Sequence, residues 1–276
     1  MPTALNGMFE LAYETFGLND DPVIICLPGM GSQLLVYPEA LCWSLVDRGF
    51  YVIRMDLRDS GRSTATDESV SYTLSDMADD VVAVLDHAEA ETAVVMGLSL
   101  GGMVAQQVAI DHPERVRALV SVASTTREPD LPATPDEIVA ALTAPAVDDL
   151  ERQLDIDVAA RKLWSNSEWF EPDAYRVYAR SCYERGEVAG GGLRQVTAAY
   201  GSPLQVDELA ALDVPTLVVH GQADTLLPVE HGRRTAELVP GAELLEIDGM
   251  SHDFVYQMWP PLIDAVTRLT ASTFND

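Results

Sequence analysis

Cysteine is scarce in this chain, and its few cysteines form no recognisable motif. Cys26, Cys42 and Cys182 are the three among 276 residues, with no CxxC spacing and no Cys/His cluster. An odd number without such spacing argues against a disulfide framework and a zinc site. No other metal-binding or nucleotide-binding motif stands out in the sequence, so we expect neither a metal ion nor another cofactor. Cys26 lies in an apolar run and is expected to be a small buried hydrophobe.

Positive charge is also scarce. The chain has 17 Lys and Arg against 44 Asp and Glu, which gives a formal net charge of -27 at pH 7. A surface of this kind repels nucleic acid and anionic membranes, so neither is expected as a partner. The acidity is more simply interpreted as a compositional habit of the source organism than as a binding function.

Long apolar runs are absent as well. No run is long enough to span a bilayer, and residues 1–10 lack the basic segment and apolar core of a signal peptide. We therefore expect a cytoplasmic protein. With 47% hydrophobic and 22% charged residues, the composition is that of a globular enzyme. The length allows one large domain or a core with a lid.

Short runs rich in Val, Ile and Leu alternate with helical patterns along much of the chain. These predicted strands are residues 23–27, 51–55, 93–96, 119–123 and 216–220. Uninterrupted apolar runs indicate strands that are buried on both faces, so the pattern predicts an α/β fold with a mostly parallel, doubly wound sheet. Residues 9–16 alternate instead, which predicts an antiparallel edge strand.

The alternation of strands and helices stops between about residues 127 and 212. Thr134 to Glu137 has the form of a capping box, and helical patterns follow at 147–164 and 172–185. We predict a helical cap at 127–212 inserted between two parts of an α/β core, 1–126 and 213–276. Because no strand precedes Gly190-Gly191-Gly192, this run is predicted to be a flexible turn rather than a phosphate loop.

The segment Gly97-Leu98-Ser99-Leu100-Gly101 follows a predicted strand and precedes an apolar helical pattern. A GxSxG motif in that context is typical of a nucleophile elbow. Glycines on both sides allow the strand and the helix to approach closely, and the helix N-terminus favours developing negative charge. The motif therefore predicts Ser99 as a nucleophile.

A serine hydroxyl needs a base to become a good nucleophile. Of the five histidines, His252 lies in a loop after a predicted strand, where an open α/β sheet builds its site. His220 is the one serious rival and is interpreted as packing below the site. Asp224 follows another strand and is predicted to orient His252. Asp253 adjoins His252 but is expected to be solvated at the surface.

An oxyanion hole needs two backbone N–H donors. We expect one from Leu100, directly after the nucleophile, and the other from Met30 in the loop Pro28-Gly29-Met30-Gly31-Ser32. The predicted cap is rich in aromatic side chains, some of which would line an apolar substrate pocket. The residues expected to contact the substrate are Gly29, Trp164, Trp169 and Tyr178.

These segments resemble the α/β-hydrolase superfamily over nearly the whole chain. The resemblance rests on residues 28–32, 56–63, 97–102, 220–224 and 249–252. Within the superfamily the chain is similar to small actinobacterial esterases that include the aclacinomycin-type methylesterases. The resemblance implies a serine esterase that cleaves a carboxylic ester of an apolar small molecule, a methyl ester among them, through an acyl-enzyme. Pro28 is a departure, since many members carry histidine there.

Other functions remain open at this point. The same three side chains serve lactone and C–C bond hydrolases and haloperoxidase-like perhydrolases. Cofactor-free oxygenases share the fold and keep the His/Asp pair. A third class is a binding or receptor protein with a residual triad. No feature of the sequence sets the oligomeric state.

Overall fold

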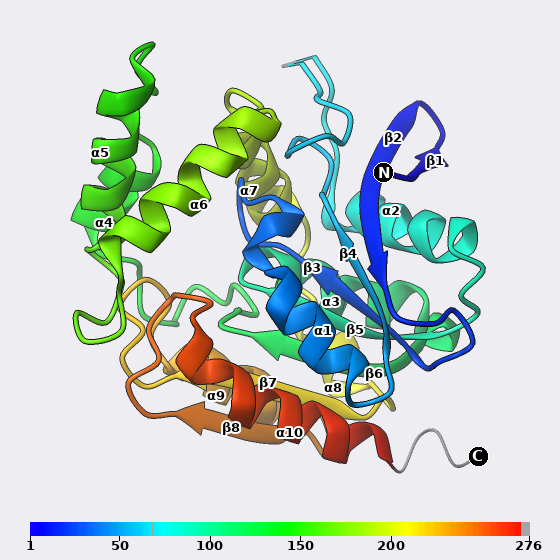
Figure 1. Ribbon diagram of the computed structural model, residues 1–276. Coiled ribbons are helices and arrows are strands. Elements are labelled where there is room, and N and C mark those ends of the chain that lie inside the picture. Colours follow the sequence, from blue (N-terminus) through cyan, green and yellow to red (C-terminus); the bar gives the residue numbers. More distant parts are fainter. Residues whose placement is uncertain (68, 272–276) are drawn as a thin grey trace.

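The computed structural model describes residues 1–67 and 69–271, and within them eight strands form one sheet (Figure 1). The strand order is β1-β2-β4-β3-β5-β6-β7-β8. β1 pairs antiparallel with β2, and β2 pairs antiparallel with β4, whereas β4 to β8 pair in parallel. The strands are β1 (Thr3–Asn6), β2 (Phe9–Phe16), β3 (Val23–Leu27), β4 (Tyr51–Met55), β5 (Ala93–Leu98), β6 (Val116–Val122), β7 (Thr216–Gly221) and β8 (Glu243–Ile247).

The mostly parallel sheet predicted from the apolar runs is confirmed, but residues 9–16 are not its edge. β1 covers the outer side of β2 and is itself the edge strand. A turn at Gly7, where φ is 59°, joins the two strands. β1 has only four residues, too few for its alternation to stand out in the sequence.

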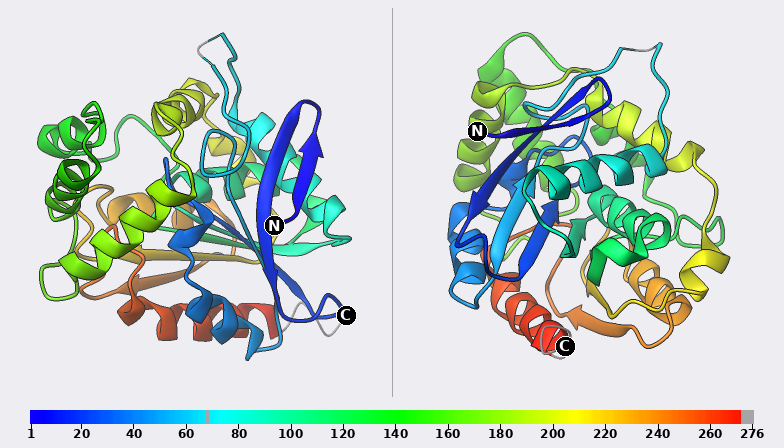
Figure 2. Two further views of the ribbon diagram at one scale, coloured as in Figure 1. Left: turned by 45° about the horizontal axis from the view of Figure 1, so that its top comes forward. Right: turned by 90° about the vertical axis from the view of Figure 1, so that its right-hand side faces the viewer.

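The sheet has a hydrophobic core on each face, and neighbouring strand residues point into different cores. Ile24 and Cys26 of β3 pack on one side, while Ile25 and Leu27 pack on the other. In Figures 1 and 2, α1 and α10 cover the first face and α2 and α3 cover the second. Because both faces are covered, the central strands β3 and β5 carry no polar side chain. The covering helices are α1 (Glu39–Val46), α2 (Leu74–His87), α3 (Leu100–Asp111), α9 (Glu230–Leu238) and α10 (Trp259–Ala271).

The chain between β6 and β7 is largely helical. It forms α4 (Asp136–Leu142), α5 (Leu150–Arg161), α6 (Pro172–Arg185), α7 (Gly191–Gly201) and α8 (Val206–Ala210). α4, α5 and α6 lie together on one side of the molecule (Figures 1 and 2), whereas α8 packs against α3 and α9. Within the described residues, no helix is long and apolar enough to cross a membrane.

Two local predictions for this helical insert are wrong, one wholly and one in part. Thr134 forms no capping box, because its hydroxyl donates to the carbonyl of Leu226 at 2.9 Å and Pro135 occupies the N-cap of α4. Of the glycine run, only Gly190 lies in a turn, with a φ of 68°, whereas Gly191 and Gly192 begin α7 and Gly191 is buried. Tertiary contacts that are remote in sequence decide both cases.

Arginines of the insert form ion pairs with aspartates of the core. Each aspartate side chain is at most 4% exposed, so the carboxylates of these pairs are shielded from solvent. The insert is therefore tied to the core by charge as well as by apolar packing. The pairs are Arg161 with Asp253, Arg185 with Asp56 and Arg194 with Asp59.

Candidate active site

Ser99 occupies the sharp turn between β5 and α3. Its φ of 55° and ψ of -116° are strained for a residue with a Cβ. Two hydrogen bonds hold the strained residue. Its N–H donates to the carbonyl of Val122 at 2.8 Å, and the Ser124 hydroxyl donates to its carbonyl at 2.8 Å. The turn thus presents the Ser99 hydroxyl at the carboxyl end of β5.

The glycines beside Ser99 are required by close backbone packing. A Cβ on Gly97 would lie 1.9 Å from the carbonyl oxygen of Gly101, across the turn. A Cβ on Gly101 would lie 2.2 Å from the carbonyl oxygen of Leu27, at the end of β3. Both distances are far shorter than a van der Waals contact, so only glycine fits at either position.

His252 connects Ser99 to a buried carboxylate. Its Nε2 lies 2.9 Å from Ser99 Oγ, and its Nδ1 lies 2.8 Å from Asp224 Oδ2. The loop after β8 carries His252, and the backbone N–H of His252 donates to the carbonyl of Trp164 at 3.3 Å. The structure thus brings together the three side chains that the sequence singled out, from the ends of β5, β7 and β8.

Asp224 is fixed by bonds on both carboxylate oxygens. Oδ1 accepts from the N–H groups of Leu226 and Leu227, each at 2.9 Å, which leaves Oδ2 for His252. Burial alone would raise the pKa of Asp224, but the charge and hydrogen bonds of His252 and His220 hold it well below its usual range. Asp224 is therefore an ionised acceptor facing His252.

His220 does not reach the serine. It is fully buried and its Nε2 donates to the carbonyl of Leu227 at 2.8 Å. The same nitrogen lies 3.5 Å from Asp224 Oδ2. His220 therefore packs beneath the carboxylate, as the sequence analysis predicts.

The loop after β3 lies against the nucleophile turn. A Cβ on Gly29 would be 3.4 Å from Ser99 Cβ, so the loop backbone passes directly beside the hydroxyl-bearing residue. Among the described residues, no acceptor is found for the N–H groups of Met30 and Leu100. The loop after β3 and the start of α3 thus each provide, near Ser99, one backbone N–H without an acceptor in the part of the chain that the structure describes.

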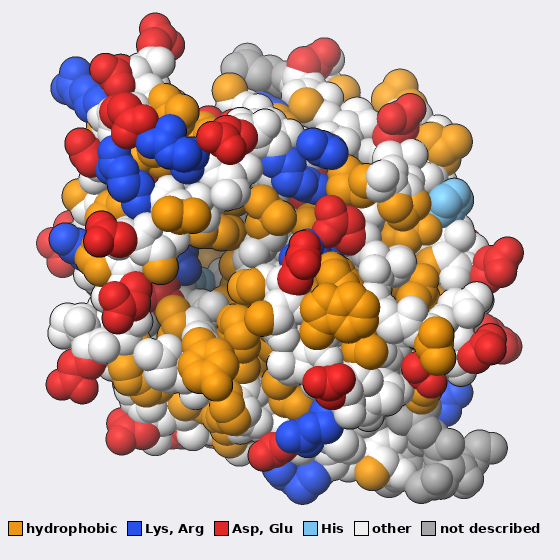
Figure 3. Space-filling view, in the orientation of Figure 1, with side chains coloured by type: hydrophobic (Ala, Val, Ile, Leu, Met, Phe, Trp, Pro, Cys, Tyr) orange, Lys and Arg blue, Asp and Glu red, His pale blue; other side chains and the backbone are white. Residues whose placement is uncertain are grey.

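The predicted substrate-contacting aromatics lie in the helical insert. Trp164 bonds the His252 backbone, and the ring of Trp169 packs over Gly249 in the same loop, 2.8 Å from where a Cβ would be. Tyr178 belongs to α6, where its ring lies 5.8 Å from that of Tyr175. Figure 3 shows hydrophobic side chains gathered around a hollow on the side of the molecule that bears α6.

Asp253 departs from its expected role at the solvated surface. Its side chain is only 4% exposed and forms an ion pair with Arg161 of α5. The Arg161 guanidinium also lies 5.3 Å from the ring centre of Tyr175. The insert covers this loop and removes Asp253 from water, which the sequence around His252 does not reveal.

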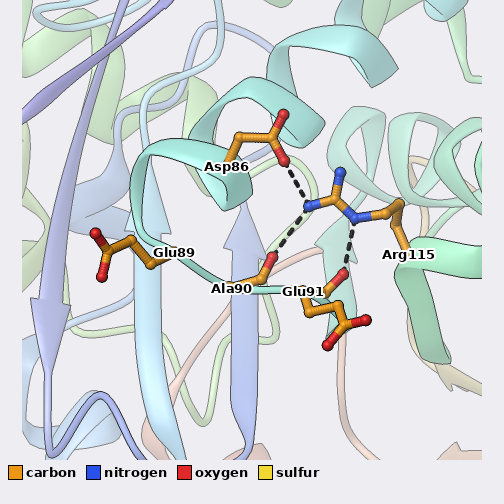
Figure 4. A pocket seen from close by; sticks show the side chains of 5 residues that line it. All are labelled: Asp86, Glu89, Ala90, Glu91 and Arg115. Atoms are coloured by element: carbon orange, nitrogen blue, oxygen red, sulfur yellow. Dashed lines mark hydrogen bonds and ion pairs between the residues drawn. The ribbon is translucent and has the colours of Figure 1, made fainter.

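A second hollow lies at the opposite end of the sheet. It has a volume of about 350 Å³ and lies where α2 ends and β5 begins (Figure 4). Arg115 in its wall donates to Asp86 and to the carbonyls of Ala90 and Glu91. The Arg115 guanidinium is thus satisfied by its neighbours, and Ser99 is at the other end of β5. Among the described residues, no cluster of His, Cys, Asp and Glu could hold a metal ion.

Comparison with known proteins gives matches along most of the chain. A sequence profile described as the alpha/beta hydrolase fold matches residues 22–257. Rhodomycin D methylesterase of Streptomyces peucetius is 28% identical, with 98% of each chain covered. 3-Oxoadipate enol-lactonase 2 of Acinetobacter baylyi is 25% identical over 94% of this chain and 93% of its own. The crystal structure of an enol-lactonase from Burkholderia xenovorans superposes with a TM-score of 0.76 at 22% identity, covering 100% of both chains.

Proposed function

The chain belongs to the α/β-hydrolase fold family, and on this premise we propose that it is a serine hydrolase that cleaves carboxylic esters of apolar small molecules. The observation that carries the proposal is the hydrogen-bonded relay from Asp224 through His252 to Ser99. A nucleophile, a base and a carboxylate that orients the base are the groups required for acyl transfer.

In the first half-reaction, Ser99 Oγ attacks the ester carbonyl carbon while its proton passes to His252 Nε2. Asp224 holds the histidine in the tautomer that has a free Nε2 and stabilises the imidazolium that forms. The N–H groups of Met30 and Leu100 bind the oxyanion of the tetrahedral intermediate. A donor of this kind is worth about 3 kcal/mol of activation free energy. His252 then protonates the departing alkoxide, leaving the acyl group on Ser99.

In the second half-reaction, a water molecule gives a proton to His252 Nε2 and attacks the acyl carbon. The same two N–H groups bind the second oxyanion, and collapse returns the proton to Ser99 Oγ as the carboxylic acid leaves. The water gains a bond to carbon and the ester oxygen of Ser99 loses one, so the enzyme is regenerated without any other reactant.

The substrate pocket is proposed to lie between the core and a cap formed by residues 127–212. Gly29 would contact the acyl group at the oxyanion loop, and Trp164, Trp169 and Tyr178 would supply apolar walls. The contacts of Trp164 and Trp169 with the His252 loop support this placement. A pocket of this kind fits an ester with a bulky apolar part better than a small polar one.

A methyl ester is the proposed form of the substrate, because the relative in Streptomyces peucetius is named a methylesterase. The test is a panel of p-nitrophenyl and methyl esters with acyl groups of rising size, assayed with the wild type and with Ser99→Ala. Ser167→Ala, an exposed serine of the insert, is the matched control. Hydrolysis lost only in Ser99→Ala supports the proposal, and no turnover of any ester overturns it.

A lactonase is the second candidate, because the relative from Acinetobacter baylyi is named an enol-lactonase and an internal ester needs the same three side chains. Adding lactones to the panel distinguishes the two. A cofactor-free oxygenase would consume oxygen without needing the serine, so oxygen uptake unchanged in Ser99→Ala would favour that reading.

A further inference from the structure

Helix α7 of the insert is hydrogen-bonded to the loop that carries Met30. The N–H of Gly31 donates to Oε1 of Gln195 at 2.8 Å. Nε2 of the same side chain donates to the carbonyl of Arg58 at 2.7 Å. Gln195 is fully buried. Both ends of its amide are therefore used by two loops of the core.

The glycines at the start of α7 allow this helix to approach the core closely. A Cβ on Gly192 would lie 3.2 Å from Gly31 Cα and 3.3 Å from Met30 Cγ. A Cβ on Gly191 would lie 2.0 Å from the carbonyl oxygen of Asp59. The first turn of α7 therefore lies against two core loops. Gly191 is too close to the loop after β4 for any side chain, and Gly192 is in tight contact with the loop after β3.

The bond from Gln195 determines how the peptide between Met30 and Gly31 is oriented. Gly31 has a φ of 63°, and the N–H of Ser32 closes the turn by donating to the carbonyl of Gly29 at 3.1 Å. The Gly29 carbonyl shares a peptide group with the Met30 N–H. With that carbonyl held by Ser32 and the Gly31 N–H held by Gln195, the turn cannot rotate without breaking a hydrogen bond. The N–H of Met30 is left without an acceptor among the described residues.

We propose that Gln195 is a positioning residue for the oxyanion hole, so that the Met30 N–H is correctly aimed only while α7 is docked on the core. The proposal rests on the proposed function, since it takes Met30 as an oxyanion donor. Its consequence is that movement of the cap and assembly of the catalytic site are one event. A substrate that displaces α7 from the core would be hydrolysed slowly, even though Ser99, His252 and Asp224 keep their positions.

The first test replaces Gln195 by methionine, which keeps the volume and removes both hydrogen bonds. The matched control is Gln106→Met in α3, because Gln106 is 4% exposed and its Nε2 donates to Ser121 at 3.1 Å, away from the loop. We expect kcat to fall about 10- to 100-fold in Gln195→Met, a part of the loss from removing a whole oxyanion donor. KM should change little, and Gln106→Met should keep its kcat.

Two inhibitors separate positioning from general damage. A trifluoromethyl ketone adds Ser99 Oγ and places an oxyanion in the hole, whereas the matching methyl ketone binds the pocket without a stable adduct. Gln195→Met should weaken binding of the trifluoromethyl ketone by about the factor by which kcat falls. Binding of the methyl ketone should be unchanged. Equal loss of both inhibitors, or of neither, would overturn the proposal.

A glycine pair in α7 gives an independent test. Gly192→Ala places a methyl group against Gly31 and should reduce kcat, whereas Gly201→Ala has nothing within 4 Å of its new Cβ and should not. Amide hydrogen exchange of residues 28–34 reads the loop without any catalysis, and should be faster in Gln195→Met and Gly192→Ala than in either control. Unchanged exchange in both would contradict the proposal. An inactive wild type with altered exchange in the variants would instead overturn the esterase function alone.

Discussion

Asp224→Asn is the substitution for which the structure gives the most specific outcome. Oδ1 of Asp224 accepts from two backbone N–H groups, of Leu226 and Leu227, so an asparagine must turn its carbonyl oxygen toward them. Its NH2 group then faces His252 Nδ1, in the position of Oδ2. A donor there forces the proton of the imidazole onto Nε2, which can no longer accept the proton of Ser99.

The expected loss in kcat is about 10⁴-fold, which corresponds to about 5.5 kcal/mol of activation free energy. The protein should still fold at pH 7, because the side chain keeps its shape and its bonds to the backbone. The assay is kcat/KM for a p-nitrophenyl ester, with the unfolding midpoint measured on the same sample. A folded Asp224→Asn enzyme that keeps activity within tenfold of the wild type would refute the reasoning. The asparagine NH2 group would then not face His252 Nδ1.

Three further outcomes follow from packing and charge. Gly97→Ala should lower the free energy of unfolding by about 3 kcal/mol in a urea titration, because its Cβ would meet the carbonyl of Gly101 at 1.9 Å. Arg161→Met should lower the free energy of unfolding by about 3–5 kcal/mol in the same assay, because it leaves the Asp253 carboxylate buried without a partner. The double variant with Asp253→Asn should regain most of that loss. The pKa of Asp224 is lower in the folded than in the unfolded protein, so its stabilising contribution is complete above about pH 4 and is lost as the pH falls below that. In urea titrations, the free energy of unfolding should therefore fall less between pH 7 and pH 3 for Asp224→Asn than for the wild type.

The parts of the fold that local patterns determine could be predicted from the sequence. Strands buried on both faces give uninterrupted apolar runs, and the parallel sheet followed from them. The serine turn was recognisable because its glycines are required by backbone contacts within a few residues, Gly97 against Gly101. Ser99, Asp224 and His252 were singled out because each follows a strand, and parallel strands end at one edge of a sheet.

Features set by contacts between distant segments could not be predicted. Asp253 is buried by Arg161, which lies 92 residues earlier in the chain. Thr134 donates to a carbonyl 92 residues later instead of capping its helix. Gln195 is a polar residue in a helix of the insert, and nothing nearby indicates that it bonds a loop 164 residues away. The triple glycine beside it was a usable clue, since glycines at the start of a helix indicate a close approach of another backbone.

The central claim is that Ser99 is an activated nucleophile. It is tested most directly by the intact mass of the protein after exposure to a fluorophosphonate, for the wild type and for Ser99→Ala. The account predicts one adduct on the wild type and none on the variant. An unmodified wild type, or an adduct that persists in Ser99→Ala, would contradict it.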